Sequence, residues 1–586
     1  MRVPEDLSPP ERLLWAAFNE GGRLDLAEGR DAHTDVRRAA EWGPERRVRA
    51  AALTALLRGV PEASGGVTAL CLNGARITGT LCLRHLRTEC SLLLENCSFD
   101  EPVDMAHAEV FSLSLRGSRI PGVDAYGVLI RGDLVLSHVT AGGLGLFGAR
   151  VEGRLWLVGA RLTRADGYAL DAPDMVVSGG LYCGGGFTAH GGVNVYGASV
   201  GAGFDLDGAR LVNSRGFALR APNLVVASDL TCRNAVFMGG VNVFGAEVGG
   251  QFWLNATRLT NTDGWALNAP NVKVGGGLYS RGGMVAEGGV NLYGARIGAG
   301  VELQGGRLVN RRSAALRAPH MTVAGDLTCG DGFSAVGGVE LSGCRVEGRL
   351  SFRGADLSDA EPGALTCTDA QVRAFFLDRL RSAPGVVSLS GTTVEVIHDD
   401  GGFQPEHLDL DRARYVVLTP YRPARERITW IRRGRTGYQP WCYEQLAAYY
   451  RRIGHDEDAR TVLLAKQRHR RETLRLPAKL WGHLQDVTVG YGYRPLRALG
   501  WLGSGIAATA VFFAIHPPKR ATEEGAPHFS APAYAADVFL PVLDLGQQRA
   551  FTPQGVGQWV AWAAVLAGWV LATTVIAGVT RNVVRA

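Results

Sequence analysis

The sequence lacks the residue patterns of most metal and cofactor sites. Its ten cysteines include no Cys-x-x-Cys pair, and its histidines show no metal-ligand spacing. Three cysteines, Cys183, Cys232 and Cys329, recur at one position of a repeat, which favours a small buried side chain over a ligand or a disulfide. We therefore expect no metal, no cofactor and no structural disulfide.

A long apolar run is missing from residues 1–30, so we expect no secretory signal and place the repeats in the reducing cytoplasm. Net charge is also small: the formal value is +6, and the excess of Lys and Arg falls after residue 396. A nucleic-acid surface requires Lys and Arg clustered along the docking face. The near-neutral repeats therefore predict no nucleic-acid partner.

Glycine, in contrast, is abundant, with 78 residues and no collagen period. The chain repeats every 48 or 49 residues, as a run of similar words shows: Gly148-Ala-Arg-Val, Gly197-Ala-Ser-Val, Gly245-Ala-Glu-Val, Gly294-Ala-Arg-Ile and Gly343-Cys-Arg-Val. Each repeat divides into halves of about 24 residues, with four apolar positions mostly five or six residues apart. This spacing excludes amphipathic helices and predicts a solenoid whose coils have four short sides. Residues 66–396 would form roughly 13 to 15 such coils.

Three words of the repeat, Ala149-Arg-Val151, Ala198-Ser-Val200 and Ala209-Arg-Leu211, resemble those of pentapeptide-repeat proteins. The resemblance implies a right-handed β-helix with square coils, although the coil is longer here than in that family. The predicted fold is therefore mainly β, a solenoid over residues 66–400. A helical cap over residues 1–65 would cover its first coil.

The C-terminal part changes to helical spacing. Residues 401–485 predict a basic helical hairpin region, and residues 486–586 a transmembrane region with two spans, Ala498–Ile515 and Val560–Val579. The apolar segment 532–546 between the spans is too short to cross a bilayer, which indicates a re-entrant or interfacial segment. Basic residues near the first span are candidates for lipid contact: Arg468, Arg470, Arg471, Arg494 and Arg497. The positive-inside rule then places both termini and the β-helix in the cytoplasm.

The layout as a whole resembles bacterial, especially actinobacterial, membrane proteins with pentapeptide-like repeats and a two-span tail. The resemblance is carried by four words: Tyr443-Glu-Gln-Leu, Ala465-Lys-Gln-Arg, Val487-Thr-Val-Gly-Tyr-Gly-Tyr-Arg-Pro and Pro541-Val-Leu-Asp-Leu-Gly-Gln. It implies a two-pass protein of the bacterial plasma membrane. Such proteins are sometimes labelled membrane-associated oxidoreductases, but no motif defines their chemistry.

Two sets of residues are candidate functional sites. Asparagines and aromatic residues recur at one phase of the repeat and are expected to point outward: Asn194, Tyr196, Asn242, Phe244, Asn291 and Tyr293. This surface suits a partner protein, a glycan or self-association, and the alternative is an asparagine ladder that only stabilises the stack. In segment 532–546, Asp537 and Asp544 are the charges available to a cation in a pore.

Catalytic motifs are not convincing. Gly143-Leu-Gly-Leu-Phe-Gly148 satisfies a dinucleotide-binding pattern, but another β coil follows it where the mechanism requires a helix. Asp205 and Asp207 form a lone acidic pair in a variable column. The favoured function is a non-enzymatic, membrane-tethered scaffold or binding platform. The alternatives are an oligomeric two-span channel or membrane effector regulated by the β-helix, and an enzyme acting on the β-helix surface.

Overall fold

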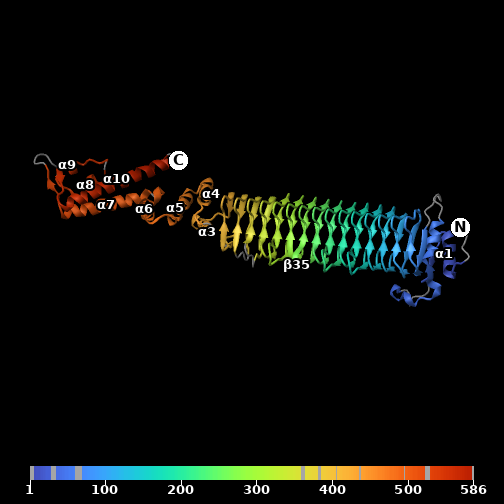
Figure 1. Cartoon of the computed structure of the whole chain (residues 1–586). Helices are drawn as coiled ribbons and strands as arrows, with labels where there is room; N and C mark the ends of the chain where they lie inside the picture. The colour runs from blue at the N-terminus through green and yellow to red at the C-terminus, as the bar shows by residue number, and fades with distance from the viewer. Residues whose placement is uncertain are drawn as a thin grey trace. The chain divides into compact units, whose positions relative to one another are not determined.

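The computed structural model describes residues 6–27, 35–59, 69–357, 363–380, 385–403, 405–434, 437–493, 495–521, 528–540 and 542–583. The chain forms two compact units, Met1–Tyr421 and Arg422–Ala586. The first unit is the solenoid with its N-terminal cap, and the second is helical (Figure 1).

The first unit is a parallel β-solenoid of about 15 turns, which confirms the predicted architecture and the expected number of coils. One coil shows its four sides: β19 (Arg161–Thr163) on side 1, β20 (Leu170–Asp171) on side 2, β21 (Val176–Val177) on side 3 and β22 (Leu181–Tyr182) on side 4. Each strand pairs in parallel with the strand of the same side in the next coil, as β19 does with β23 (Thr188–His190). Residues of one column in the regular coils are therefore neighbours although they lie 20 to 27 positions apart in the chain.

Aliphatic side chains from all four sides fill the interior. In the coil of β19 to β22, Leu162, Leu170, Val177 and Leu181 are at most 1% exposed. Each contacts residues of the same column above and below it, so the core is continuous along the axis. Burying one such side chain contributes about 1.5–3 kcal/mol, but only when both neighbouring coils are in place.

Left-handed backbone at the corner after side 2 explains why the repeat spans two coils. Asn223 (φ 54°) and Gly245 (φ 63°) occupy this corner in successive coils. A Cβ atom on Gly245 would lie 2.7 Å from Oδ1 of Asn223, so the asparagine occupies the space that a second side chain would need. Glycine thus alternates with Asn, Asp or His along the corner, in the order Asp174, Gly197, Asn223, Gly245, Asn271, Gly294, His320 and Gly343.

The corner between sides 1 and 2 alternates as well. Every second coil carries a longer connection there, which we call a corner loop: residues 164–168, 213–217, 261–265 and 310–314, of which 261–265 lies within the long strand β35 (Arg258–Asn268). The coils between them have a Gly-Gly pair, such as Gly191-Gly192, at the same place. A Cβ atom on Gly191 would lie only 2.7 Å from the carbonyl oxygen of Arg164, so the loop and the glycine pair require each other.

Both ends of the solenoid extend past its regular coils. At the N-terminal end, α1 (Pro9–Asn19) and α2 (Ala50–Arg58) accompany two short strands, β1 (Arg23–Asp25) and β2 (Arg47–Arg49). These strands pair with β3 (Ala69–Asn73) and β4 (Arg76–Thr78), so the cap adds strands to the stack as well as covering it. At the other end, β52 (His407–Asp409) and β53 (Arg414–Thr419) continue the stack beyond residue 400.

Helices make up most of the second unit: α3 (Ala424–Arg432), α4 (Pro440–Arg452), α5 (Asp456–Glu472), α6 (Leu476–Val489), α7 (Pro495–Ile515), α8 (Ala531–Phe539) and α10 (Val556–Val583). Among the described residues, one helix is long and apolar enough to cross a membrane, through Val556–Thr573 of α10, with a mean hydropathy of 1.4. Within α7, Leu499–Ile515 is a shorter apolar segment. The other expected span, Ala498–Ile515, therefore stays a prediction.

Segment 532–546 begins as helix α8, which packs against α7 and α10. Phe513 of α7, Tyr534 and Phe539 of α8, and Ala561 of α10 belong to one buried apolar cluster. Gly568 of α10 lies against the carbonyl group of Phe539, and a Cβ atom at this position would overlap it. The short segment is thus held closely between the two longer helices.

Candidate functional site

The outer surface of side 2 carries a continuous column of polar side chains. Its residues stand in register on successive coils: Asp171, Asn194, Arg220, Asn242, Asn268, Asn291, Arg317 and Glu340. Four of the neighbouring pairs in the column are hydrogen bonded. Nδ2 of Asn194 donates to Oδ1 of Asp171 at 2.7 Å, and Nη1 of Arg220 donates to Oδ1 of Asn194 at 3.0 Å. Parallel stacking brings these groups within bonding distance of one another, as in cross-β ladders.

The three predicted asparagines lie on the outer side of the coil, but their neighbours cover them. Asn194 is 5% exposed and Asn291 is 6% exposed. Asn242 accepts a hydrogen bond from Nδ2 of Asn268 at 3.2 Å, and Asn268 in turn accepts one from Asn291 at 3.0 Å. A partner would have to replace these bonds in order to reach the amide groups. The asparagines therefore stabilise this surface through hydrogen bonds between coils.

The aromatic residues remain accessible. Tyr196, Phe244 and Tyr293 are 38%, 43% and 38% exposed. The coils between them place prolines, Pro222 and Pro270, in the same column, so that a ring recurs on every second coil. Sequence reasoning found the rings but missed the prolines, although these recur with the same period.

Arginines of the polar column support two of the rings. The guanidinium carbon of Arg220 lies 5.1 Å from the ring centre of Tyr196, and that of Arg317 lies 5.5 Å from the ring centre of Tyr293. These are cation–π distances. Side 2 thus presents separate aromatic rings, two of them supported by arginines, on a polar base, which is an arrangement suited to binding.

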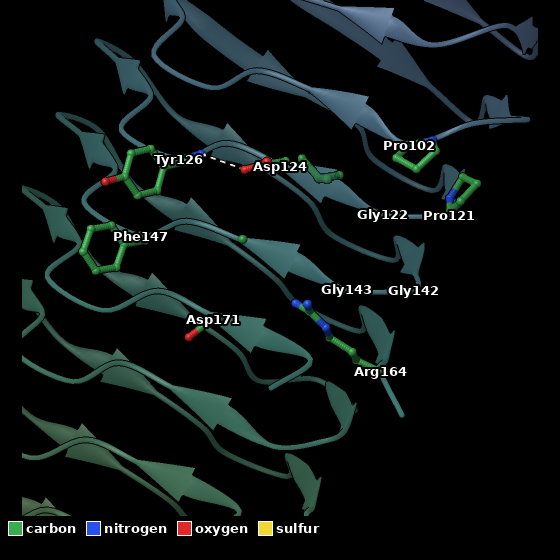
Figure 2. A pocket seen from close by; sticks show the side chains of 12 residues that line it. Pro102, Pro121, Gly122, Asp124, Tyr126, Gly142, Gly143, Phe147, Arg164 and Asp171 are labelled. Atoms are coloured by element: carbon green, nitrogen blue, oxygen red, sulfur yellow. Dashed lines mark hydrogen bonds between the residues drawn. The ribbon is translucent and has the colours of Figure 1, made fainter. Parts of the chain in front are cut away.

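A hollow of about 460 Å³ interrupts the column near its N-terminal end. Gly145 lies there in register between Asp124 and Asp171. Because glycine has no side chain, this position leaves a gap in the column. Figure 2 shows Tyr126 and Phe147 on one side of the hollow and Arg164 on the other, with the two aspartates between them. The two rings are parallel, with centres 5.0 Å apart.

The dinucleotide-like motif, residues 143–148, lines this hollow as part of a β coil. Strand β16 (Leu144–Gly145) is followed by a turn and by β17 (Arg150–Val151), as in other coils. The acidic pair of Asp205 and Asp207 binds backbone amides: Oδ1 of Asp205 accepts from Asp207 N, and Oδ1 of Asp207 accepts from Arg233 N, both at 2.7 Å. Over the described part of the chain, no group of three or more His, Cys, Asp or Glu residues is arranged to hold a metal ion.

Two of the five candidate lipid-binding arginines are engaged within the helical unit. Arg468 Nη2 and Arg471 Nη1 lie 2.8 and 3.2 Å from the carboxylate of Asp486. Burial disfavours ionisation of Asp486, but the hydrogen bonds from both arginines outweigh it and lower the pKa of the carboxyl. Arg470 and Arg497 are exposed, and Arg494 lies outside the described residues.

The two candidate pore aspartates are also bonded. Asp537 is 4% exposed, and its two oxygens accept from the backbone N–H groups of Leu545 at 2.8 Å and Gln548 at 2.7 Å. Asp544 is exposed and forms an ion pair with Arg549 at 2.7 Å. Asp537 therefore holds the turn that follows α8.

The chain matches no protein-family model, no curated protein and no solved structure. The chain is thus a β-solenoid followed by helices. Among the described residues, one helix is apolar and long enough to span a membrane. Its function has to be argued from the surfaces described above.

Proposed function

We propose that the protein is a membrane-anchored, non-enzymatic binding platform whose solenoid presents the aromatic column of side 2 to a protein partner. In this proposal both α7 and α10 cross the bacterial plasma membrane. The solenoid, of the right-handed, pentapeptide-like type, lies in the cytoplasm with both termini. The observation that carries the proposal is the recurrence of Tyr196, Phe244 and Tyr293 as exposed rings on every second coil.

The energetics favour these rings as contact points. A large aromatic side chain has about 150–250 Å² of surface, and roughly 40% of each ring residue here is accessible. Covering that area contributes about 2 kcal/mol per ring at 25 cal/mol per Å², before the costs of association. The hydrogen-bonded asparagines below keep the rings in place, so little additional order has to be imposed when a partner docks.

The anchoring part is supported by the composition of the helical unit. The segment Val556–Thr573 is apolar enough to cross a bilayer, and Trp559, Trp562 and Trp569 within it are exposed. Tryptophan is enriched at membrane interfaces. Removal of α7 to α10 should convert a protein that resists alkaline extraction from membranes into one that is released.

The binding part is tested with a photo-reactive amino acid placed at Phe244 of the full-length protein in cells. The matched control carries it at Val225, which is 42% exposed on side 3. We expect one discrete cross-linked species from position 244 only, and its loss when Tyr196 and Tyr293 are changed to Ser. Equal cross-linking from both positions, or none from position 244, would contradict the proposal. A product of two copies of the chain would replace the protein partner with self-association.

A further inference from the structure

Side 1 carries a column of arginines, most of which recur with the 48- or 49-residue period of the sequence. Five of them stand in register on alternate coils: Arg119, Arg161, Arg210, Arg258 and Arg307. The coils between them place uncharged residues in the column: Thr140, Thr188, Val236 and Val285. Neighbouring coils are about 4.8 Å apart, so the guanidinium groups recur at about 10 Å along a straight line.

These arginines are exposed and have no acidic partner among the residues that the structure describes. Some basic residues of other columns are neutralised between coils: Lys273 pairs with Glu247 and Arg281 with Glu302, both at 2.6 Å. The acidic residues of the adjacent corner loops form ion pairs with other arginines: Asp166 pairs with Arg215 at 2.7 Å, and Asp263 pairs with Arg312 at 2.9 Å. Side 1 therefore carries a regular column of exposed arginines whose charge no described acidic residue compensates.

The arrangement favours a linear ligand. A single file of charges follows one line along the axis, whereas binding to a lipid surface calls for a broad basic patch. Carboxylate, sulfate and phosphate groups all fit the guanidinium fork. The second outward position of side 1 holds Thr163, His190, Val212, Met238, Thr260, Glu287 and Val309 on successive coils, so Glu287 is the one acid among these seven residues. These offer no Phe, Tyr or Trp platform for stacked bases, which disfavours single-stranded nucleic acid.

We propose that side 1 binds a linear acidic polysaccharide whose chain follows the solenoid axis. Its carboxylate or sulfate groups pair with the arginines, and the neutral sugars between them lie over the uncharged coils. A polymer with one anionic group on every second sugar has this alternation of charged and neutral units. The site is separate from the aromatic column of side 2, so it does not depend on the function proposed above or on which side of the membrane carries the solenoid.

The test measures binding of hyaluronan oligosaccharides, in which charged and neutral sugars alternate, to the full-length protein in detergent. The variant Arg161→Ser/Arg210→Ser/Arg258→Ser removes three central charges. The matched control, Arg150→Ser/Arg296→Ser/Arg345→Ser, removes three exposed arginines of side 3. We expect the side-1 variant to raise Kd by tenfold or more and the control to change it less than threefold. Binding should weaken as salt is raised, because exposed ion pairs are screened.

Three outcomes would overturn the inference. The first is no binding, and the second is an equal loss in both variants, which would indicate attraction by total charge. The third is tighter binding of poly(U), polyphosphate or anionic vesicles through the same arginines, since the ligand class would then be wrong. Hydrogen exchange of side-1 strands in each variant shows that the fold is retained. Cross-linking at Phe244 is measured in a separate experiment. The proposal for side 1 and the proposal for side 2 can therefore each be refuted without the other.

Discussion

Replacing Gly245 by asparagine would put a side chain where that of Asn223 now lies. Asparagine tolerates the left-handed backbone of this corner, so the change tests side-chain overlap with little backbone strain. The new side chain would also point along the stack toward Asn271, the next residue of the corner. Overlap with Asn223 begins at the Cβ atom, 2.7 Å from Oδ1.

Forcing extra atoms into a packed site costs about 1–3 kcal/mol, and here the overlap occurs on two sides. We expect the local stability of the surrounding coils to fall by about 2–3 kcal/mol, which speeds amide exchange roughly 30- to 160-fold. The effect should be measurable in β29 (Val225–Val226), β33 (Glu247–Val248) and β36 (Lys273–Val274) of the full-length protein. Strand β43 (Thr322–Val323), farther along the stack, should be unchanged.

The inverted variant, Asn223→Gly/Gly245→Asn/Asn271→Gly, supplies the control. It restores the alternation with glycine and asparagine exchanged, so both overlaps disappear. The variant should recover most of the lost protection against amide exchange. About 1 kcal/mol of local stability should remain lost, because the variant contains one additional glycine. Exchange in the inverted variant as fast as in the single variant, or no effect of the single variant, would refute the reasoning.

Two further predictions concern the ends of the chain. Glu11 of α1 is buried, and although burial disfavours its charge, hydrogen bonds from Arg49 and from Ser8 N lower the pKa of its carboxyl to about 2. A lowered pKa stabilises the folded cap above the ordinary value of 4.5, so about 3 kcal/mol should be lost between pH 4.5 and 2. Hydrogen exchange in α2 should report this loss, and Glu11→Gln should flatten the pH dependence; an unchanged profile would contradict it. Asp537→Ala should loosen the turn after α8 by about 1–3 kcal/mol, through two unpaired amides, without altering ion flux into liposomes. Selective flux in the wild type that this variant abolishes would instead favour the channel.

Periodicity in the sequence is sufficient to predict the solenoid. Inward positions such as Leu162 and Leu181 recur at spacings that no helix can use, and a coil closed by four such positions buries them all. The outward phase of Tyr196, Phe244 and Tyr293 follows from the same alternation, because successive side chains of a strand point to opposite faces. That a helix near the C-terminus is apolar and long enough to cross a membrane is, by contrast, predictable from composition alone, since a run of apolar residues needs no tertiary partner to be recognised.

What only the tertiary structure decided is which residues meet between coils. Parallel stacking brings together positions 20 to 27 residues apart, and the interval changes with every corner loop. The burial of Asn194, the restriction of Gly191 by the loop at Arg164, and the alignment of Arg161 with Arg210 all depend on that register. Local sequence sets the inward and outward positions of each coil. The neighbours of each side chain, and hence its charge balance and accessibility, are set by the stack.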